Sequence, residues 1–588
     1  MNSGGPLSSF VSQVRGVRFA DDEARALLAG VLPTLDCPGD DFERVKQGIT
    51  RTVYRGRAAG QDLYLKHFHP KMLLHRIARR LGVSHAMREL RFSRFLGDHG
   101  VPVPRALAAV CRGDTEWVAT ATVESAEQGD RWHEEQLARD AAGRRAIRAA
   151  TVELARVIAA MHDAGVLHGD LHCGNVLVRT DTPEPKLVLT DLHRVRRCRW
   201  LSRRARAANL AQLLHDRRDL TTRTERLRFL KHYLAASRVG GAVRGWRILI
   251  EERARRHSAR QYAKRDRRIT GTNRYFTRLR LGDGWRGHAM LASKYALGGS
   301  RAAAMAFRAD DWRAVLADPE ALLTGPDVTV VKDSPTSLVV RRRIEVGGQE
   351  IDVHIKRTRR KRPWKILLDC LRRARSIRAF RLGHELLNRR VATALPLVAL
   401  EQRRGAFLLD SLLIAETVEG APLSTFLDKH LQPGGGDDRP LGPAEQRSLA
   451  QAVLWQLGRL VQRLHDHSYA HRDLKAPNLL VRWDRRGDEP PSPEIVLVDL
   501  DGLRRMWHLS AKRRFQGLMR LNVSLLKCPV VTHAGRLRML QGYIRRPGLG
   551  RVNFKPYWRV LADWSGRKLT QQIRSRRKRQ KAVRRPQA

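Results

Sequence analysis

The strongest constraint on this chain is a short pattern of polar residues around an apolar hairpin. His471-Arg-Asp473 is followed five residues later by Asn478, and a further apolar strand ends at Asp499. The residues between Asn478 and Asp499 fit two short strands joined by a turn, which would return the chain to its starting point. Loop and hairpin would therefore bring two carboxylates and one amide close together.

The same pattern occurs a second time, nearer the N-terminus. His168, Asp170, Asn175 and Asp191 follow one another in the same order, and each of the first three lies 303 residues before its counterpart. The helix that precedes each loop repeats at the same distance, with apolar residues at positions i, i+3, i+4 and i+7. The chain therefore contains a tandem duplication of one kind of domain.

These residue types, in this spacing, are what phosphoryl transfer from ATP requires. One carboxylate can accept the proton of the attacking hydroxyl, while an amide oxygen and a second carboxylate hold Mg²⁺ against the phosphates. The predicted catalytic residues are Asp170 and Asp473. The predicted metal ligands are Asn175, Asp191, Asn478 and Asp499. The sequence thus predicts a kinase that uses ATP and Mg²⁺ and phosphorylates an alcohol group.

Each copy also has a lysine on an apolar strand, followed by a helix that carries a glutamate. An ion pair between them would order the small lobe and hold the lysine against the ATP phosphates. The predicted nucleotide-binding residues are Lys66 with Glu89, Lys356 with Glu385, and Lys475. The lysine and the glutamate are 23 residues apart in the first copy and 29 in the second.

The expected fold class is α+β, with two tandem bilobal domains of the protein-kinase-like type. Each would have a small, mainly β N-lobe and a helical C-lobe. The expected boundaries are a leader at 1–40, a first domain at 41–283, a connector at 284–324, a second domain at 325–560 and a basic tail at 561–588.

The chain is strongly basic, with 112 Lys and Arg against 59 Asp and Glu and a net charge of +53. Attraction to an anionic membrane surface, binding to nucleic acid and a bias of solvated surfaces toward arginine all fit this excess. Nucleic acid is the least supported, because no recognition motif accompanies the charge. We therefore expect an anionic membrane surface as a partner and do not expect nucleic acid.

The arrangement of the cysteines and the lack of a recognisable secretion signal both indicate the cytoplasm. The six cysteines are scattered without a CxxC pair, as is typical of free thiols in a reducing cytoplasm. The N-terminus has no basic segment followed by a continuous apolar one, and no window approaches 18 apolar residues. We expect a cytoplasmic protein, with peripheral attachment to the inner face of the cytoplasmic membrane.

Several segments resemble the lipopolysaccharide core kinases, the Kdo and heptose kinases of the bacterial inner core. The resemblance rests on YLKHF and HIKRT at the lysine strands, HGDLHCGN and HRDLKAPN at the loops, and TDLHRVRR and VDLDGLRR at the metal segments. It implies phosphorylation of a hydroxyl on a core sugar or similar glycolipid at the inner-membrane face. The chain departs from the family pattern in having two domains, and in Asp191-Leu-His where the second copy has Asp-Leu-Asp.

Three other functions are compatible with the same motifs. A Ser/Thr protein kinase would use Lys475 to steady the γ-phosphate, but no Ala-Pro-Glu segment follows Asp499. The loop HGDLHCGN also fits a phosphotransferase for a small alcohol, such as an antibiotic or a choline-like compound. One copy could instead be a pseudokinase scaffold, although both copies contain the complete set of polar residues.

Overall fold

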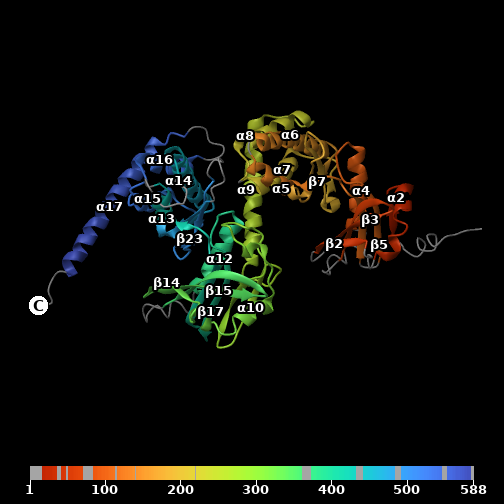
Figure 1. Cartoon of the computed structure of the whole chain (residues 1–588). Helices are drawn as coiled ribbons and strands as arrows, with labels where there is room; N and C mark the ends of the chain where they lie inside the picture. Colours follow the sequence, from red (N-terminus) through yellow and green to blue (C-terminus); the bar gives the residue numbers. More distant parts are fainter. Residues whose placement is uncertain are drawn as a thin grey trace, which may run out of the picture. The chain divides into compact units, whose positions relative to one another are not determined.

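The structure is a computed structural model of the 588-residue chain (Figure 1). It describes residues 16–35, 41–47, 51–69, 84–112, 115–139, 141–218, 220–359, 373–431, 441–483, 492–545 and 552–583. The chain forms two compact units, Met1–Ala259 and Arg260–Ala588. Each unit contains a sheet and a mainly helical part, so that the fold is α+β with two tandem bilobal domains.

The N-lobe of the first unit is a six-stranded antiparallel sheet with the order β1-β5-β6-β4-β3-β2. Its strands are β1 Val17–Phe19, β2 Phe42–Gln47, β3 Arg51–Ala58, β4 Gln61–Phe68, β5 Ala106–Arg112 and β6 Thr115–Ala121. Ala59 and Gly60 form a two-residue turn between β3 and β4, and both have positive φ, as this hairpin type requires. Helix α4 (His85–Asp98) packs on β5 and β6, with its N-cap Ser84 accepting a hydrogen bond from Met87 N–H.

The C-lobe of the first unit is built on helix α6 (Ala141–Asp163), whose apolar face is buried. Around it lie α5 Gly129–Ala138, α7 Arg203–Arg217, α8 Arg223–Ala236 and α9 Val243–Arg268, with the short strands β7 Ala126–Gln128, β8 Val166–Leu167, β9 Val176–Arg179, β10 Lys186–Leu189 and β11 Arg196–Arg197. Strands β9 and β10 form the predicted hairpin, with Val176 opposite Leu189. The hairpin thus places Asn175 beside the residues that lead to Asp191.

The N-lobe of the second unit is a seven-stranded antiparallel sheet with the order β12-β13-β17-β18-β16-β15-β14. Its strands are β12 Phe276–Arg280, β13 Trp285–Met290, β14 Thr329–Ser334, β15 Ser337–Val346, β16 Gln349–Thr358, β17 Pro396–Arg404 and β18 Phe407–Glu416. Gly347 and Gly348, both with positive φ, form the two-residue turn between β15 and β16. Helices α10 (Ala309–Val315) and α12 (Arg375–Asn388) accompany this sheet, and Trp312 of α10 is fully buried.

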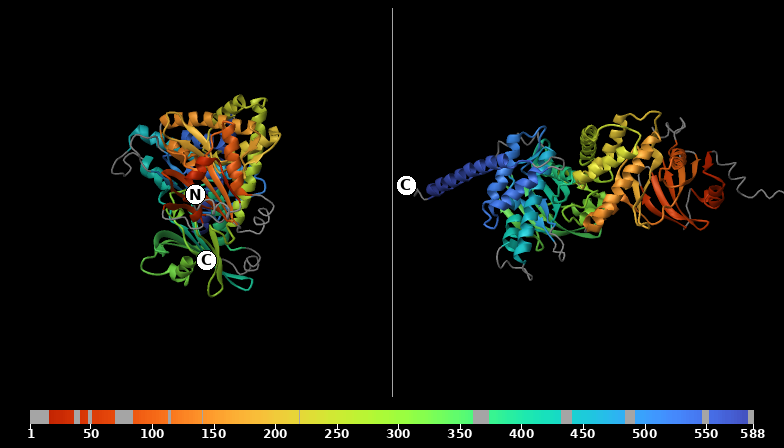
Figure 2. Two further views of the ribbon diagram at one scale, coloured as in Figure 1. Left: turned by 90° about the vertical axis from the view of Figure 1, so that its right-hand side faces the viewer. Right: turned by 90° about the horizontal axis from the view of Figure 1, so that it is seen from above.

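The C-lobe of the second unit repeats the first, with the long helix α14 (Pro443–Asp466) in the place of α6. Its other helices are α13 Leu423–Leu431, α15 Ala511–Leu525, α16 His533–Ile544 and α17 Lys555–Val583. Its short strands are β19 Ala421–Pro422, β20 Tyr469–His471, β21 Leu479–Arg482, β22 Glu494–Leu497 and β23 Leu503–Arg505. Helix α17 is drawn as one continuous helix in the right-hand view of Figure 2.

The boundary between the units differs from the expected one at 283. The chain passes from one unit to the next within α9, between Ala259 and Arg260. Strands β12 and β13, in the expected end of the first domain and the expected connector, belong to the sheet of the second N-lobe, where β13 pairs with β17. Neither strand is a continuous apolar run, because exposed arginines interrupt the buried residues, so the sequence pattern did not mark them as strands.

The expected leader is also part of the first N-lobe where the structure describes it. Strand β1 pairs with β5, and helix α2 (Asp22–Leu27) contributes Ala24 to the core of that lobe. Among the helices of the described residues, none is both long enough and apolar enough to span a membrane.

Candidate active sites

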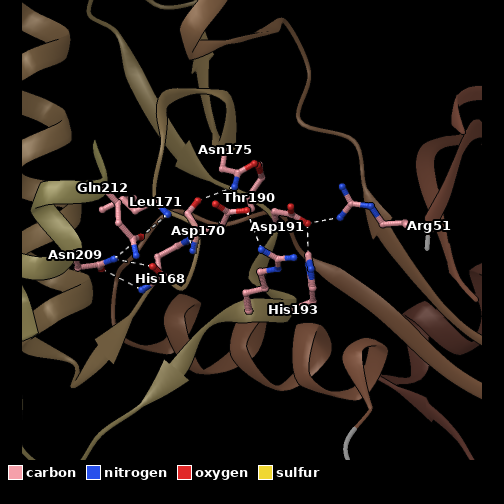
Figure 3. A network of polar contacts seen from close by, with 11 residues as sticks. Arg51, His168, Asp170, Leu171, Asn175, Thr190, Asp191, His193, Asn209 and Gln212 are labelled. Atoms are coloured by element: carbon pink, nitrogen blue, oxygen red, sulfur yellow. Dashed lines mark hydrogen bonds and ion pairs between the residues drawn. The ribbon is translucent and has the colours of Figure 1, made fainter. Parts of the chain in front are cut away.

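The catalytic loop of the first unit is shaped by a buried histidine (Figure 3). His168 Nε2 donates to the carbonyl of Thr190 at 2.9 Å, and its Nδ1 accepts the backbone N–H of Asp170 at 3.2 Å. Burial lowers the pKa of His168, so the ring is neutral at pH 7. The histidine therefore links the loop to the strand before Asp191, and both of its ring nitrogens are already engaged within the protein.

Asn175 fixes the other end of this loop. Its side-chain Nδ2 donates to the carbonyl of Asp170 at 2.8 Å, and its own carbonyl accepts the N–H of Thr190 at 2.9 Å. Because the amide nitrogen is engaged, the amide oxygen is the atom left for a cation, and oxygen is the ligand that Mg²⁺ prefers. Figure 3 shows Asp170, Asn175 and Asp191 next to one another.

The carboxylate of Asp170 is only half-buried, as a group that receives a proton from a substrate should be. Its Oδ2 lies 3.3 Å from a guanidinium nitrogen of Arg194. Behind the loop, Asn209 of α7 donates to the carbonyl of His168 at 2.6 Å and accepts the N–H of the same residue at 3.1 Å. Asn209 of helix α7 thus fixes the backbone of the loop at His168, while the carboxylate of Asp170 stays accessible.

Asp191 lies in the left-handed region, with φ of 68° and ψ of 48°. Its carboxylate forms an ion pair with Arg51 of β3, and His193 Nδ1 lies 2.8 Å from its Oδ1. Burial alone would raise the pKa of Asp191, but the contact with His193 and the charges of Arg51 and Lys66 outweigh burial and lower it. The group is therefore ionised at pH 7, as a cation ligand must be.

The nucleotide-binding lysine of the first unit is held by the helix. Lys66 of β4 forms an ion pair with Glu89 of α4, and the glutamate is almost fully buried. The pair joins the sheet to the helix and keeps the ammonium group on the side of Asp191, whose pKa its charge lowers.

The second unit repeats the loop geometry closely. His471 Nε2 donates to the carbonyl of Asp499 at 2.7 Å, and its Nδ1 accepts the N–H of Asp473 at 3.2 Å. Asn478 Nδ2 donates to the carbonyl of Asp473 at 2.8 Å. The cation beside the half-exposed carboxylate is Lys475, whose Nζ lies 2.8 Å from Asp473 Oδ2.

The nucleotide-binding lysine of the second unit has a different partner from the predicted one. Lys356 Nζ lies 2.7 Å from Asp501 Oδ2 and 3.4 Å from Asp499 Oδ1. Burial would lower the pKa of Lys356, but the charges of Asp501 and Asp499 raise it. The prediction that Glu385 pairs with Lys356 is wrong: Glu385 Oε2 instead accepts the hydroxyl proton of Tyr469 at 2.6 Å.

The register of the two helices explains the error. The two lysines are 290 residues apart, and so are Gly100 and Arg390, the positive-φ residues that follow α4 and α12. On this register the counterpart of Glu89 is Ala379, and Glu385 lies six residues further along the helix. The acidic partner has thus moved from the helix to Asp501, on the loop after the metal ligand.

Four residues near the two sites were not predicted from the sequence. They are Arg51, His193, Arg194 and Asp501. Asp501 and His193 left a signal, because the second copy reads Asp-Leu-Asp where the first reads Asp-Leu-His. Nothing in the spacing of Arg51 or Arg194 distinguishes them from the many other arginines of this basic chain.

Two lobes, a lysine in the sheet, and a catalytic loop with Asp, Asn and Asp define an ATP-dependent phosphotransferase of the protein-kinase-like fold. The comparison with protein families identifies which one. The model of the lipopolysaccharide kinase (Kdo/WaaP) family matches residues 41–233 and again residues 336–543. The chain belongs to this family and is an ATP-dependent kinase, with one family match in each unit.

Individual proteins that resemble this chain have low sequence identity to it. The EKC/KEOPS complex subunit Tp53rkb of Mus musculus is 28% identical over 195 residues, which cover 31% of this chain and 70% of that protein. Among solved structures, WaaP in complex with acyl carrier protein is 22% identical with a TM-score of 0.33, covering 41% of this chain and 98% of that one. An aminoglycoside-3'-phosphotransferase of type VIII is 19% identical with a TM-score of 0.27, covering 40% of this chain and all of the other.

Proposed function

We propose that both units transfer the γ-phosphate of ATP to a hydroxyl of a lipopolysaccharide core sugar or a similar glycolipid. The observation that carries the proposal is the presence of two complete catalytic loops. In each loop an accessible aspartate is hydrogen-bonded through its backbone carbonyl to an asparagine, and a second, ionised aspartate completes the set. The family match supports a sugar hydroxyl as the acceptor.

In this proposal Asp170 and Asp473 each accept the proton of the acceptor hydroxyl as it attacks the γ-phosphate. The neutral His168 and His471 hold these aspartates in place through their backbone N–H groups. Lys66 and Lys356 then neutralise charge on the ATP phosphates, since both ammonium groups are held beside the metal-binding aspartate of their own site.

The residues of each site also fit a magnesium ion. Asn175 with Asp191, and Asn478 with Asp499, offer an amide oxygen and a carboxylate, the hard donors that Mg²⁺ takes. The pKa of Asp499 is lowered because the charge of Lys356 and the Asp501 N–H outweigh burial, which alone would raise it. Such an ion, when bound, would neutralise negative charge on the ATP phosphates.

The assay that tests this function offers γ-labelled ATP to the purified chain with three acceptors. These are lipid-linked core oligosaccharide, the same oligosaccharide freed from lipid, and a generic protein substrate. We expect transfer to the two sugar acceptors, and its loss when Asp170→Ala and Asp473→Ala are combined. Label on the protein substrate alone would contradict the proposed acceptor class, and retained transfer in the double variant would contradict the proposed sites.

A protein hydroxyl is a second candidate acceptor for the second unit only. Lys475 lies 2.8 Å from the carboxylate of Asp473, and a lysine at this place can steady a γ-phosphate next to the hydroxyl. The first unit has His172 at the corresponding position. The protein arm of the assay, run on Asp170→Ala, decides between the two acceptors for this unit.

The proposed location is the inner face of the cytoplasmic membrane, with peripheral attachment. The net charge of +53 and the basic C-terminal end of α17 support attachment to anionic lipid, at about 1 kcal/mol for each Lys or Arg near the surface. Co-sedimentation with anionic vesicles should weaken as salt rises, and should weaken further when Arg574–Ala588 is removed. Equal, negligible binding to neutral and anionic vesicles would contradict this location.

A further inference from the structure

A basic cavity of about 210 Å³ lies in the second unit, outside the catalytic loop. Its walls come from three places: the C-terminal end of α9, the segments on either side of the β12–β13 hairpin, and the last turn of α12. The lining residues are Gln261, Lys264, Arg265, Arg268, Arg274, Tyr275, Phe276, Ala292, Ser293, Lys294, Tyr295, His384, Leu387 and Asn388. None of them belongs to the set that holds the phosphates or the acceptor in the proposed function.

The charge of this cavity has one sign. Five of the lining residues are lysine or arginine, and among the described residues that line it none is acidic. Lys264 and Arg268 are exposed one turn apart on α9 and form no ion pair within the described part of the chain. By contrast, many exposed arginines of the same unit are paired, as Arg341 is with Asp352 at 2.5 Å.

Two tyrosines of the cavity wall contact three of its cationic side chains. Arg265 donates to the hydroxyl of Tyr295 at 2.7 Å, and Arg274 stacks over the ring of Tyr275 at 4.6 Å from the centroid. Lys294 Nζ lies 5.4 Å from the centroid of Tyr295. These contacts limit the freedom of long side chains, which reduces the entropy that an incoming anion would have to remove.

The walls themselves are joined by a buried ion pair beside the cavity. Both carboxylate oxygens of Asp266 on α9 are bound by the guanidinium of Arg389, at 3.0 and 2.7 Å, and Arg505 binds one of them at 3.0 Å. The carboxylate of Asp266 is therefore already neutralised. On the α12 side, His384 donates to a backbone carbonyl, and burial lowers its pKa to about 3, so it carries no charge at pH 7.

We propose that this cavity binds a phosphate-bearing ligand. Several guanidinium and ammonium groups around one concave, oriented site match the charge and the many acceptor oxygens of a phosphorylated compound better than the single charge of a carboxylate. Phosphate chemistry can come from a soluble phosphorylated molecule or from the headgroup of a phospholipid. The proposal does not depend on the acceptor of the kinase reaction.

The test is isothermal titration of pyrophosphate into the full-length chain in the presence of EDTA. Without a divalent ion, the proposed metal ligands of the two kinase sites offer no cation to the probe. The test variant replaces the exposed cations Lys264, Arg268 and Arg274 with glutamine. A matched control replaces Lys332, Arg404 and Lys555, three exposed cations of the same unit that lie outside the cavity. We expect the wild type and the control to bind, and the test variant to lose at least tenfold in affinity.

Three results would overturn the proposal: no binding by the wild type, undiminished binding by the test variant, or an equal loss in the control. Thermal unfolding of each variant shows whether its fold is intact. Lys264→Glu, a single exchange of two good helix formers at an exposed position, should also weaken binding if the triple variant does not fold. Vesicles with phosphatidic acid that displace pyrophosphate from the wild type would identify a lipid headgroup, and failure to displace it would identify a soluble ligand.

Discussion

In the first unit Lys66 pairs with a glutamate on helix α4, whereas in the second unit Lys356 pairs with Asp501, two residues after Asp499. The catalytic loops of the two units share the hydrogen bonds of the histidine Nδ1 and of the asparagine Nδ2. The same chemical need, an acid to hold the lysine, is therefore met from the small lobe in one copy and from the large lobe in the other.

This difference changes what each site depends on. The lysine of the first unit is placed only when α4 is docked on its sheet, because Glu89 is on that helix. The lysine of the second unit is tied to the loop that carries the proposed metal ligand, so its position does not rely on an acid of α12. That helix is free to use Glu385 for another contact, the hydroxyl of Tyr469 just before the catalytic loop.

The largest expected effect comes from removing the proposed bases. Asp170→Ala and Asp473→Ala should each lower the rate at their own site by roughly 10²–10⁴, because the carboxylate is needed only while the proton moves. The phosphorylated product is measured for each single variant and for the pair. Asp310→Ala, an exposed acid outside both sites, serves as the control. Wild-type product formation by the double variant would show that neither aspartate is the base.

The next largest expected effect is a difference between the two units in their stability at acid pH. Burial lowers the pKa of His162 to about 4, and burial together with the charge of Arg514 lowers that of His465 to about 3. Both values lie below the ordinary 6.5, so the unfolded state binds more protons, and stability is lost as pH falls from about 6.5 toward 4. The loss at pH 4 should be roughly 3 kcal/mol for each histidine, at about 1.4 kcal/mol per pKa unit.

The second unit should unfold first on acidification. Asn209 bonds to His162 at 3.1 Å and raises its pKa, while the second unit has Gly517 against the ring of His465. Hydrogen–deuterium exchange between pH 7 and pH 4 reports the two units separately. Protection lost first from the first unit would contradict this order. His465→Gln should narrow the difference.

Exchanging the partners of the lysines should have a smaller but more specific effect. Glu89→Gln, tested in Asp473→Ala, and Asp501→Asn, tested in Asp170→Ala, should each raise the KM for ATP by roughly 10–100-fold. A hydrogen bond to a charged group contributes about 1.5–3 kcal/mol. Steady-state kinetics with varied ATP measure this. In the second site, Ala379→Glu should restore part of the loss in Asp501→Asn, because it rebuilds the arrangement of the first site. No rescue would weaken the equivalence of Ala379 and Glu89.

The smallest effect is expected at Glu385, and it should be on stability. Glu385→Gln keeps the shape of the side chain but weakens its contacts with Tyr469 and Arg505. We expect a loss of about 1–3 kcal/mol in unfolding free energy and an unchanged KM for ATP. Urea unfolding and steady-state kinetics on Asp170→Ala measure both. A rise in KM as large as that of Asp501→Asn would return Glu385 to the role that the sequence suggested.

The sequence predicted the parts of each site that are local in the chain. His168 to Asn175 and His471 to Asn478 are set by a few consecutive residues, so a constant distance between copies was enough to find them. Glu385 was misplaced because the pairing of a strand with a helix depends on the helix register, which no local pattern determines. Arg51 was missed for the same reason, since its contact with Asp191 spans 140 residues of sequence.

The most direct test of the central claim, that both units contain a complete ATP site, is the stoichiometry of nucleotide binding. Isothermal titration with Mg²⁺ and a non-hydrolysable ATP analogue uses a parent chain in which Lys264, Arg268 and Arg274 are glutamine, so that the basic cavity does not bind the analogue. This parent should bind two molecules per chain. Asp191→Asn and Asp499→Asn should each leave one, and the double variant none. A single bound molecule in the parent, or two in either variant, would contradict the account of two independent sites.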